Sequence, residues 1–126
     1  MILGIGNDIV DVRRIEESLQ QHGRRFAQRI LSEMELEEFD ASNQQAHYLA
    51  KRFAAKEATA KALGTGFRHG MSMKHISVSR DELGKPGLIF NDVAAEKVQQ
   101  AAITAAHLSL SDERDYALAF VVLESA

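Results

Sequence analysis

Two acidic residues stand out because each occurs where the local pattern favours a small or apolar side chain. Asp8 comes just after the apolar run Ile2–Gly6, on a strand face that it shares with two glycines, which leaves open space around its carboxylate. Glu57 lies in a long helical pattern, about 20° around the helix from Ala46 and so inside the apolar stripe. Lys61 follows Glu57 by four residues, the spacing of a helical ion pair. Two carboxylates from different elements and a neighbouring ammonium suit a magnesium-bound polyphosphate.

Each of these residues also has a purely structural interpretation. Glu57 and Lys61 would form an ordinary surface pair at the edge of a helix. Asp8 would end a strand, or cap the helix that begins near Val12. The sequence alone does not show that Asp8 and Glu57 meet in space, so both interpretations stay open at this point.

Basic residues are unevenly distributed, although the net charge is −3. A basic set near the start of the chain, punctuated by Phe26, comprises Arg13, Arg14, Arg24, Arg25 and Arg29. This set is either a solvated helical face or a surface for an acidic helix, with arginine forks for carboxylates and an aromatic anchor. His107 has a similar ambiguity: beside Ser109 on the polar face of a strand, it is either solvated or a donor to a phosphate.

The composition excludes several classes of protein and site. Cysteine is absent, which excludes disulfides, thiol nucleophiles and cysteine-bound metals. The glycine pairs lack the third glycine of a dinucleotide fingerprint, and the net charge of −3 disfavours nucleic-acid binding. The apolar run Tyr116–Leu123 is shorter than the roughly 20 residues of a membrane span, and Met1–Leu3 lacks the basic start of a signal peptide. We therefore expect a cytoplasmic protein that binds neither nucleic acid nor membranes.

The elements that must position these residues follow from hydrophobic periodicity and capping signals. In the first half of the chain, the pattern predicts a strand at Ile2–Gly6 and helices at Val12–His22 and Arg24–Leu31. An acidic helix should follow, opened by a capping box of Ser32 and Glu35. A long helix should then run from a cap at Asn43 to Leu63, with Gly64 as its stop. The second half predicts a half-buried strand at Ile76–Ser79, a turn at Asp81–Gly87, a helix at Asp92–Ile103, a strand around Leu108 and Leu110, and a strand at Tyr116–Leu123.

These elements predict an α+β fold in which a small antiparallel sheet packs against the long helix. The last strand is apolar on both faces, so we expect it at the centre of the sheet, antiparallel to the strand before it. The length of 126 residues, of which 45% are hydrophobic, predicts one domain over residues 1–126.

Taken together, the motifs resemble the holo-acyl-carrier-protein synthases, the small bacterial class of 4'-phosphopantetheinyl transferases. The matching segments are Gly4–Asp11, Arg52–Ala58, Lys61–Gly66, Gly84–Pro86 and His107–Ser111. Their joint spacing is specific, whereas any one segment would be weak. Thr59 and Ala60 depart from the Phe-Ser of the family pattern, which affects local packing and leaves the charged positions in place.

The resemblance implies a reaction and a set of roles. A serine hydroxyl of an apo acyl carrier protein would attack coenzyme A, take its 4'-phosphopantetheine arm and release 3',5'-ADP, which supports fatty acid biosynthesis. The implied magnesium ligands are Asp8 and Glu57, and the implied catalytic residues are Glu57 and Lys61. Whether Glu57 takes the serine proton directly or through a metal-bound water stays open. The implied coenzyme A-binding residues are Arg52, Lys61, Gly64 and His107.

The resemblance also implies partners. It implies a homotrimer with active sites between subunits. The residues that would receive the acidic carrier protein are Arg13, Arg14, Arg24 and Arg29. The alternative is a non-catalytic oligomeric module that binds a nucleotide or an acidic protein, with Asp8 and Glu57 as structural residues. Magnesium dependence separates the two.

Overall fold

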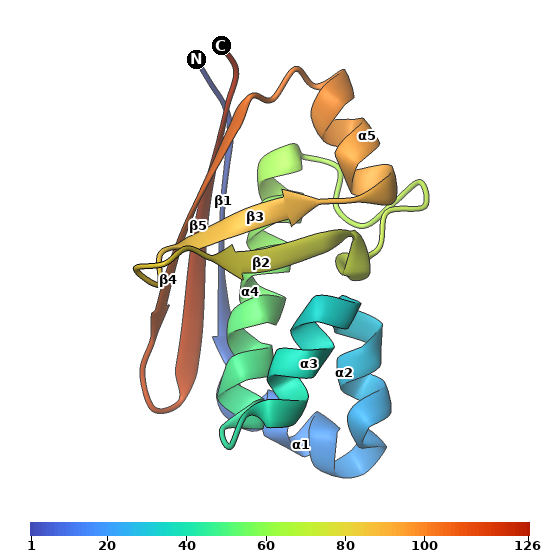
Figure 1. Cartoon of the computed structure of the whole chain (residues 1–126), viewed down its shortest axis with the longest axis vertical. Helices are drawn as coiled ribbons and strands as arrows, with labels where there is room; N and C mark the ends of the chain where they lie inside the picture. The colour runs from blue at the N-terminus through green and yellow to red at the C-terminus, as the bar shows by residue number, and fades with distance from the viewer.

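The computed structural model describes residues 1–126 (Figure 1). Its elements are, in chain order, β1 (Ile2–Asp11), α1 (Val12–His22), α2 (Arg24–Ile30), α3 (Glu33–Ala41), α4 (Gln45–Leu63), the 3-10 turn η1 (Met73–His75), β2 (Ile76–Arg80), β3 (Pro86–Phe90), α5 (Asp92–Gln100), β4 (Ala105–Asp112) and β5 (Tyr116–Glu124). None of the helices has the length and hydrophobicity to traverse a lipid bilayer.

The long helix α4 is the element around which the others are arranged. A three-stranded antiparallel sheet in the order β1-β5-β4 packs against it through β1 and β5. Figure 1 shows α1, α2 and α3 around the lower part of α4, and the two-stranded β2–β3 sheet crossing it. The predicted α+β fold is confirmed, and so are the central place of the last strand and its antiparallel pairing with the strand before it.

The two faces of β5 have different surroundings. On one face, every second side chain is fully buried against α4: Ala117, Ala119, Val121 and Leu123. On the other face, the large apolar side chains of Tyr116, Leu118 and Phe120 are 41–45% exposed. Exposed apolar residues of β1 lie on the same face: Ile9 is opposite Leu118, and Ile5 is opposite Val122, two residues beyond Phe120. One chain therefore leaves an apolar sheet face uncovered.

Glycines let β1 lie directly on the backbone of α4. A Cβ atom added to Gly4 would lie 2.0 Å from the carbonyl oxygen of Ala62, and one added to Gly6 would lie 2.0 Å from that of Ala58. The expectation of close backbone approach is therefore correct. The helix backbone fills the space over Gly4 and Gly6, whereas Asp8, farther along the strand, lines a cavity.

β1 is longer than the sequence predicts. Its pairing with the central strand continues past the predicted end at Gly6 as far as Asp11, which lies opposite Tyr116. Asp8 is thus inside the strand, opposite Ala119, rather than just after it. The polar side chains of Asn7 and Asp8 interrupt the apolar pattern. The strand continues because main-chain hydrogen bonds to the central strand β5 hold these residues in the extended conformation.

Helix boundaries agree closely with their local signals. α1 has the predicted bounds, and Glu35 accepts a hydrogen bond from the Ser32 N–H at 3.0 Å, as expected for the capping box. α4 begins at Gln45, after the predicted Asn43 cap, because the Ser42 hydroxyl accepts the Gln44 N–H at 3.0 Å and shapes the preceding turn.

The second half differs more from expectation. β3 was not predicted, because its first residues, Pro86 and Gly87, are typical of a turn. Ser77 of β2 is buried rather than exposed, and its hydroxyl donates to the Ser32 hydroxyl at 2.8 Å. α5 ends at Gln100, short of the predicted Ile103, because the chain turns through Ala102 at a φ of 59°.

Candidate active site

Asp8 and Lys61 meet across the contact between β1 and α4. The Lys61 ammonium donates to Asp8 Oδ1 at 3.1 Å and to the Asn7 carbonyl oxygen at 3.0 Å. Lys61 forms no ion pair within 4.0 Å with Glu57, so the expected helical surface pair is replaced by a contact between elements far apart in sequence. The close approach made possible by Gly6 is what brings this strand within reach of the helix side chain.

Glu57 lies one helical turn before Lys61 and is half-buried. Its pKa is raised above the usual value, first by burial and then by the negative charge of Asp8, while Lys61 acts in the opposite direction. The two carboxylates are therefore close enough to repel each other, although they come from different elements. A divalent cation placed between them would remove that repulsion.

The donor set suits magnesium rather than a metal held entirely by protein. No third Asp, Glu, His or Cys joins Asp8 and Glu57 to form a ligand cluster. Magnesium is commonly bound by one or two carboxylates and completed by substrate phosphates and water. Two hard oxygen ligands beside a lysine fit that pattern.

Glu57 separates two cavities of different character. The first, of about 560 Å³, contains Asp8 and Glu57 and has an apolar wall that includes Phe26 and Phe53. The second, of about 350 Å³, is polar, and its lining is Glu57, Ala60, Lys61, Gly64, Thr65, Gly66 and Arg68. The carboxylate pair can thus face two different ligands, one partly apolar and the other anionic.

The turn after α4 shapes the polar cavity. Gly64 ends the helix, as predicted, in the left-handed conformation with a φ of 81°, and its N–H donates to the carbonyl oxygens of Ala60 and Lys61 at 3.1 and 3.0 Å. No atom lies within 4 Å of the Cβ that a side chain would add at Gly64 or Gly66. Glycine backbone therefore forms an open wall of this cavity.

Arg52 lies apart from the carboxylate pair. Its side chain is 2% exposed, its guanidinium stacks 4.3 Å from the centre of the Tyr48 ring, and its nearest carboxylate is Glu38 at 3.9 Å. It lines neither of the two cavities that contain Glu57. Its expected role at the coenzyme A site stays a prediction.

His107 lies on the opposite face of the sheet from Asp8. It pairs with Val122 and Asp8 pairs with Ala119; these two β5 positions are three apart, so they point to opposite faces. The His107 ring is exposed, with Nε2 2.6 Å from Glu124 Oε1. Within one chain, His107 does not join Asp8, Glu57 and Lys61.

The four arginines expected to bind a carrier protein divide into two kinds. Arg13 forms a two-pronged contact with Asp11 at 2.9 and 3.0 Å, and Arg24 forms one with Asp40 at 2.9 and 2.8 Å. Arg14 and Arg29 have no carboxylate within 4.0 Å. Arg14 also lines the apolar cavity next to the carboxylate pair, which places a free guanidinium at its rim.

Sequence reasoning missed a buried ion pair directly beside the site. The Lys56 ammonium donates to Glu35 Oε1 at 2.6 Å and to the carbonyl oxygens of Ile30 and Met73 at 2.7 and 3.0 Å, and both charged side chains are fully buried. The other Glu35 oxygen accepts the Val78 N–H at 2.9 Å. The available signal was that alanines occupy more than half of the circumference of α4, a wider arc than one apolar stripe, which indicates a helix covered on several sides.

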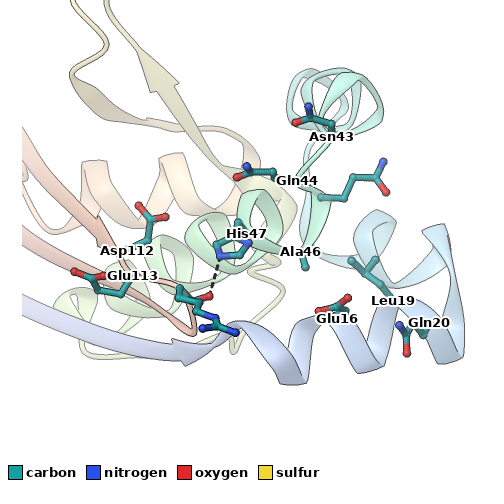
Figure 2. Close-up of a pocket in the computed structure, with 11 residues that line it drawn as sticks. Glu16, Leu19, Gln20, Asn43, Gln44, Ala46, His47, Asp112 and Glu113 are labelled. Atoms are coloured by element: carbon teal, nitrogen blue, oxygen red, sulfur yellow. Dashed lines mark hydrogen bonds between the residues drawn. The ribbon is translucent and has the colours of Figure 1, made fainter.

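A larger cavity lies elsewhere in the molecule. It has about 860 Å³ and is walled by the end of α1, the start of α4 and the β4–β5 turn (Figure 2). Its lining is mostly polar, and His47 Nε2 is tied to the Arg114 carbonyl oxygen at 3.0 Å. Figure 2 shows Asp112 and Glu113 on one side of the opening and Glu16 on the other, so these carboxylates do not converge.

Comparisons with known proteins agree in sequence and in structure. A model of the 4'-phosphopantetheinyl transferase superfamily matches residues 4–121. A holo-[acyl-carrier-protein] synthase of Vibrio parahaemolyticus is 54% identical over 124 residues, which cover 98% of both chains. The crystal structure of holo-[acyl-carrier-protein] synthase from Neisseria meningitidis aligns with a TM-score of 0.94 at 46% identity, covering 99% of this chain and 100% of that one. A holo-(acyl-carrier-protein) synthase from Bacillus anthracis, solved in complex with CoA (3',5'-ADP), aligns with a TM-score of 0.83 at 39% identity, covering 100% and 99%.

Proposed function

Because the chain belongs to the 4'-phosphopantetheinyl transferase superfamily, we infer that it transfers the 4'-phosphopantetheine arm of coenzyme A to a serine of an apo acyl carrier protein and releases 3',5'-ADP. The observation that carries this function is the placement of Asp8, Glu57 and Lys61 between an apolar and a polar cavity. A relative that covers the same length was solved with CoA (3',5'-ADP), which supports coenzyme A as the donor. The alternative of a non-catalytic binding module is not favoured.

The reaction exchanges one phosphorus–oxygen bond for another. The serine hydroxyl oxygen forms a bond to the β-phosphorus of coenzyme A, and the bond from that phosphorus to the bridging oxygen of 3',5'-ADP breaks. The serine proton passes to a base, for which Glu57 is suited because its raised pKa makes it more basic than an ordinary carboxylate. Lys61, held in place by Asp8 and the Asn7 carbonyl, supplies a fixed positive charge for the phosphate oxygens.

Asp8 and Glu57 are the residues that would hold magnesium. When bound, the ion would neutralise charge on the pyrophosphate and on the departing oxygen. The raised pKa of Glu57 supports this assignment, because burial and the charge of Asp8 outweigh the opposing effect of Lys61.

The two cavities suggest where each substrate lies. We assign the polar cavity, with Lys61 and Gly64, to the phosphates of coenzyme A. The apolar cavity, with Arg14 at its rim and Phe26 and Phe53 in its wall, is assigned to the segment around the carrier serine. Glu57 borders both and so would lie where the two substrates meet.

We also propose that the enzyme is a homotrimer. The uncovered apolar sheet face, which includes Leu118 and Phe120, needs a partner, and a second copy of the chain offers the same face. His107 lies on this face and away from Asp8 of its own chain. A neighbouring subunit is therefore the route by which His107 would reach an active site.

Intact-mass measurement tests the function directly. An apo acyl carrier protein incubated with the purified chain, coenzyme A and magnesium should gain the mass of one phosphopantetheine arm. The matched controls are a carrier with its acceptor serine replaced by alanine and a reaction with a chelator in place of magnesium. An unchanged carrier mass in the complete reaction would overturn the proposed function, and an equal gain with the chelator would overturn the metal assignment.

A further inference from the structure

The polar cavity contains a second cation, Arg68, which none of the proposed roles uses. Arg68 lies four residues after Gly64, the glycine that ends α4. It lines the cavity together with Lys61 and Glu57. Its side chain is exposed, and no carboxylate lies within 4.0 Å of it. Lys61, by contrast, is already bonded to Asp8. Arg68 is therefore the lining cation whose charge is not balanced within the chain.

The segment that carries Arg68 is held in place on both sides. Before it, Phe67 packs against a small buried cluster of Ala60, Met71, Ile76 and Ala94. After it, the chain reverses through His69 and Gly70, whose φ angles are 56° and 84°, and the Met71 N–H donates to the Arg68 carbonyl at 3.2 Å. A tight turn anchored by aromatic packing presents the guanidinium from a defined position.

The charges of the proposed donor exceed those that the site already balances. Coenzyme A carries a pyrophosphate and a separate phosphomonoester, whereas Lys61, the other cation that lines this cavity, already donates to Asp8. A guanidinium binds phosphate through two parallel N–H donors and keeps its charge at all accessible pH values. The open glycine wall formed by Gly64 and Gly66 leaves room for a phosphate to approach Arg68.

We propose that Arg68 binds a phosphate group of coenzyme A in the polar cavity and thereby sets the affinity for the donor substrate. This role rests on the proposed function. The phosphate is either the phosphomonoester or part of the pyrophosphate, and the two are distinguished by comparing coenzyme A with 3'-dephospho-coenzyme A.

Steady-state transfer to an apo carrier tests the role of Arg68. We expect Arg68→Ala to raise the KM for coenzyme A by about tenfold or more, the loss typical of a charge-assisted hydrogen bond, while the KM for the carrier and the melting temperature stay unchanged. Arg68→Lys should restore part of the affinity. Lys74→Ala is the matched control, because Lys74 is an exposed cation of the same segment that lies outside the cavity.

The two donors identify the phosphate. If Arg68 binds the phosphomonoester, Arg68→Ala affects coenzyme A and leaves the KM for the dephospho form unchanged; if it binds the pyrophosphate, both values rise equally. Unchanged KM values for both donors, or an equal effect of Lys74→Ala, would overturn the proposal. A parent enzyme that transfers nothing would instead refute the proposed function, so the two failures are distinguishable.

Discussion

At the scale of single residues, the site depends on a carboxylate whose surroundings disfavour its charge. Glu57 is partly buried and faces Asp8, and both effects raise its pKa. Such a residue binds a cation or accepts a proton more readily than a solvated one. It also weakens the folded state when it is ionised and has no ligand.

Asp8→Ala and Glu57→Gln should each lower the rate of transfer without unfolding the protein. We expect each variant to lower kcat/KM for transfer by about 10²–10⁴, the usual contribution of a base or charge stabiliser. Without divalent cations at neutral pH, Glu57→Gln should melt at a higher temperature than the parent, because it removes the repulsion. Parental turnover in either purified variant would contradict the shared site.

The pH dependence of that stability difference has a definite sign. The pKa of Glu57 is about 4.5 in the unfolded chain and is raised in the folded one. The contribution of Glu57 to stability is therefore fully present at a pH below 4.5 and is lost as the pH rises through the folded-state pKa. The advantage of Glu57→Gln should therefore vanish in acid and grow toward neutral pH. Calorimetry at several pH values measures it, and an advantage that grows toward acid would contradict the assigned cause.

Lys56 should contribute more to stability than Lys61, although both belong to α4 and both pair with a carboxylate. Lys56→Met leaves Glu35 buried without its partner, for which we expect a loss of about 3–5 kcal/mol in the free energy of unfolding. The Lys61 side chain is 54% exposed, so Lys61→Met should change it by about 1 kcal/mol or less. Urea denaturation of both variants at one fixed protein concentration measures the two changes in unfolding free energy. Equal losses in the two variants would refute the greater contribution of Lys56.

The positions of the candidate charged residues were more predictable than their contacts. Asp8 and Glu57 could be chosen as candidates because each interrupts a pattern of small or apolar residues. The bond between Lys61 and Asp8 could not, because it joins residues more than fifty positions apart in sequence. The buried Lys56 was also missed, since a helical stripe on one face cannot show that α4 is covered on several sides.

At the scale of elements, the contact between β1 and α4 controls the site because both carry its residues. Gly6→Ala would place a Cβ 2.0 Å from the Ala58 carbonyl oxygen and 2.8 Å from the Ala62 nitrogen, two backbone atoms that cannot rotate away. We expect a loss of about 3 kcal/mol or more in unfolding free energy, at the upper end for overpacking. Gly23→Ala, where φ is 66°, ψ is −156° and nothing lies within 4 Å, should cost less, about 1–3 kcal/mol from backbone strain alone.

The segment α1–α2 should recognise the carrier mainly through Arg14, an unpaired arginine at the rim of the apolar cavity. We expect Arg14→Ala to raise the KM for the carrier by about tenfold and to weaken its salt dependence, with the KM for coenzyme A unchanged. Arg24→Ala should have a smaller effect, because Arg24 is already engaged by Asp40. Steady-state kinetics at two ionic strengths would check this, and a larger effect at Arg24 would reverse the assignment.

Elements with strong local signals were predictable, and elements that depend on pairing were not. The bounds of α1 and the stop at Gly64 follow from caps that act within one turn of helix. β3 begins with Pro86 and Gly87, and only its hydrogen bonds to β2 make it a strand. The extension of β1 to Asp11 likewise comes from its partner, β5.

At the scale of the whole molecule, two residues with proposed roles, Asp8 and His107, lie on opposite faces of one sheet. If the enzyme is a trimer, light scattering should give about three times the chain mass of 14.0 kDa. Asp8→Ala and His107→Ala chains, each inactive alone, should regain about a quarter of parental turnover when mixed and allowed to exchange, because random pairing of subunits restores that share of sites. A fully active monomer, or no recovery after verified exchange, would contradict the shared site.

The order of strands in the sheet has a consequence for biosynthesis. β5 is the central strand and contains residues up to Glu124, while its neighbour β1 begins at Ile2. On a ribosome that makes the chain from its N-terminus, β1 and β4 emerge before the strand that joins them, and β1 carries exposed isoleucines with no partner. The helices can form early from local contacts, but the sheet can close only after Glu124 has left the exit tunnel. Closure of the sheet therefore waits for the synthesis of β5, and until then the exposed isoleucines of β1 have no neighbouring strand.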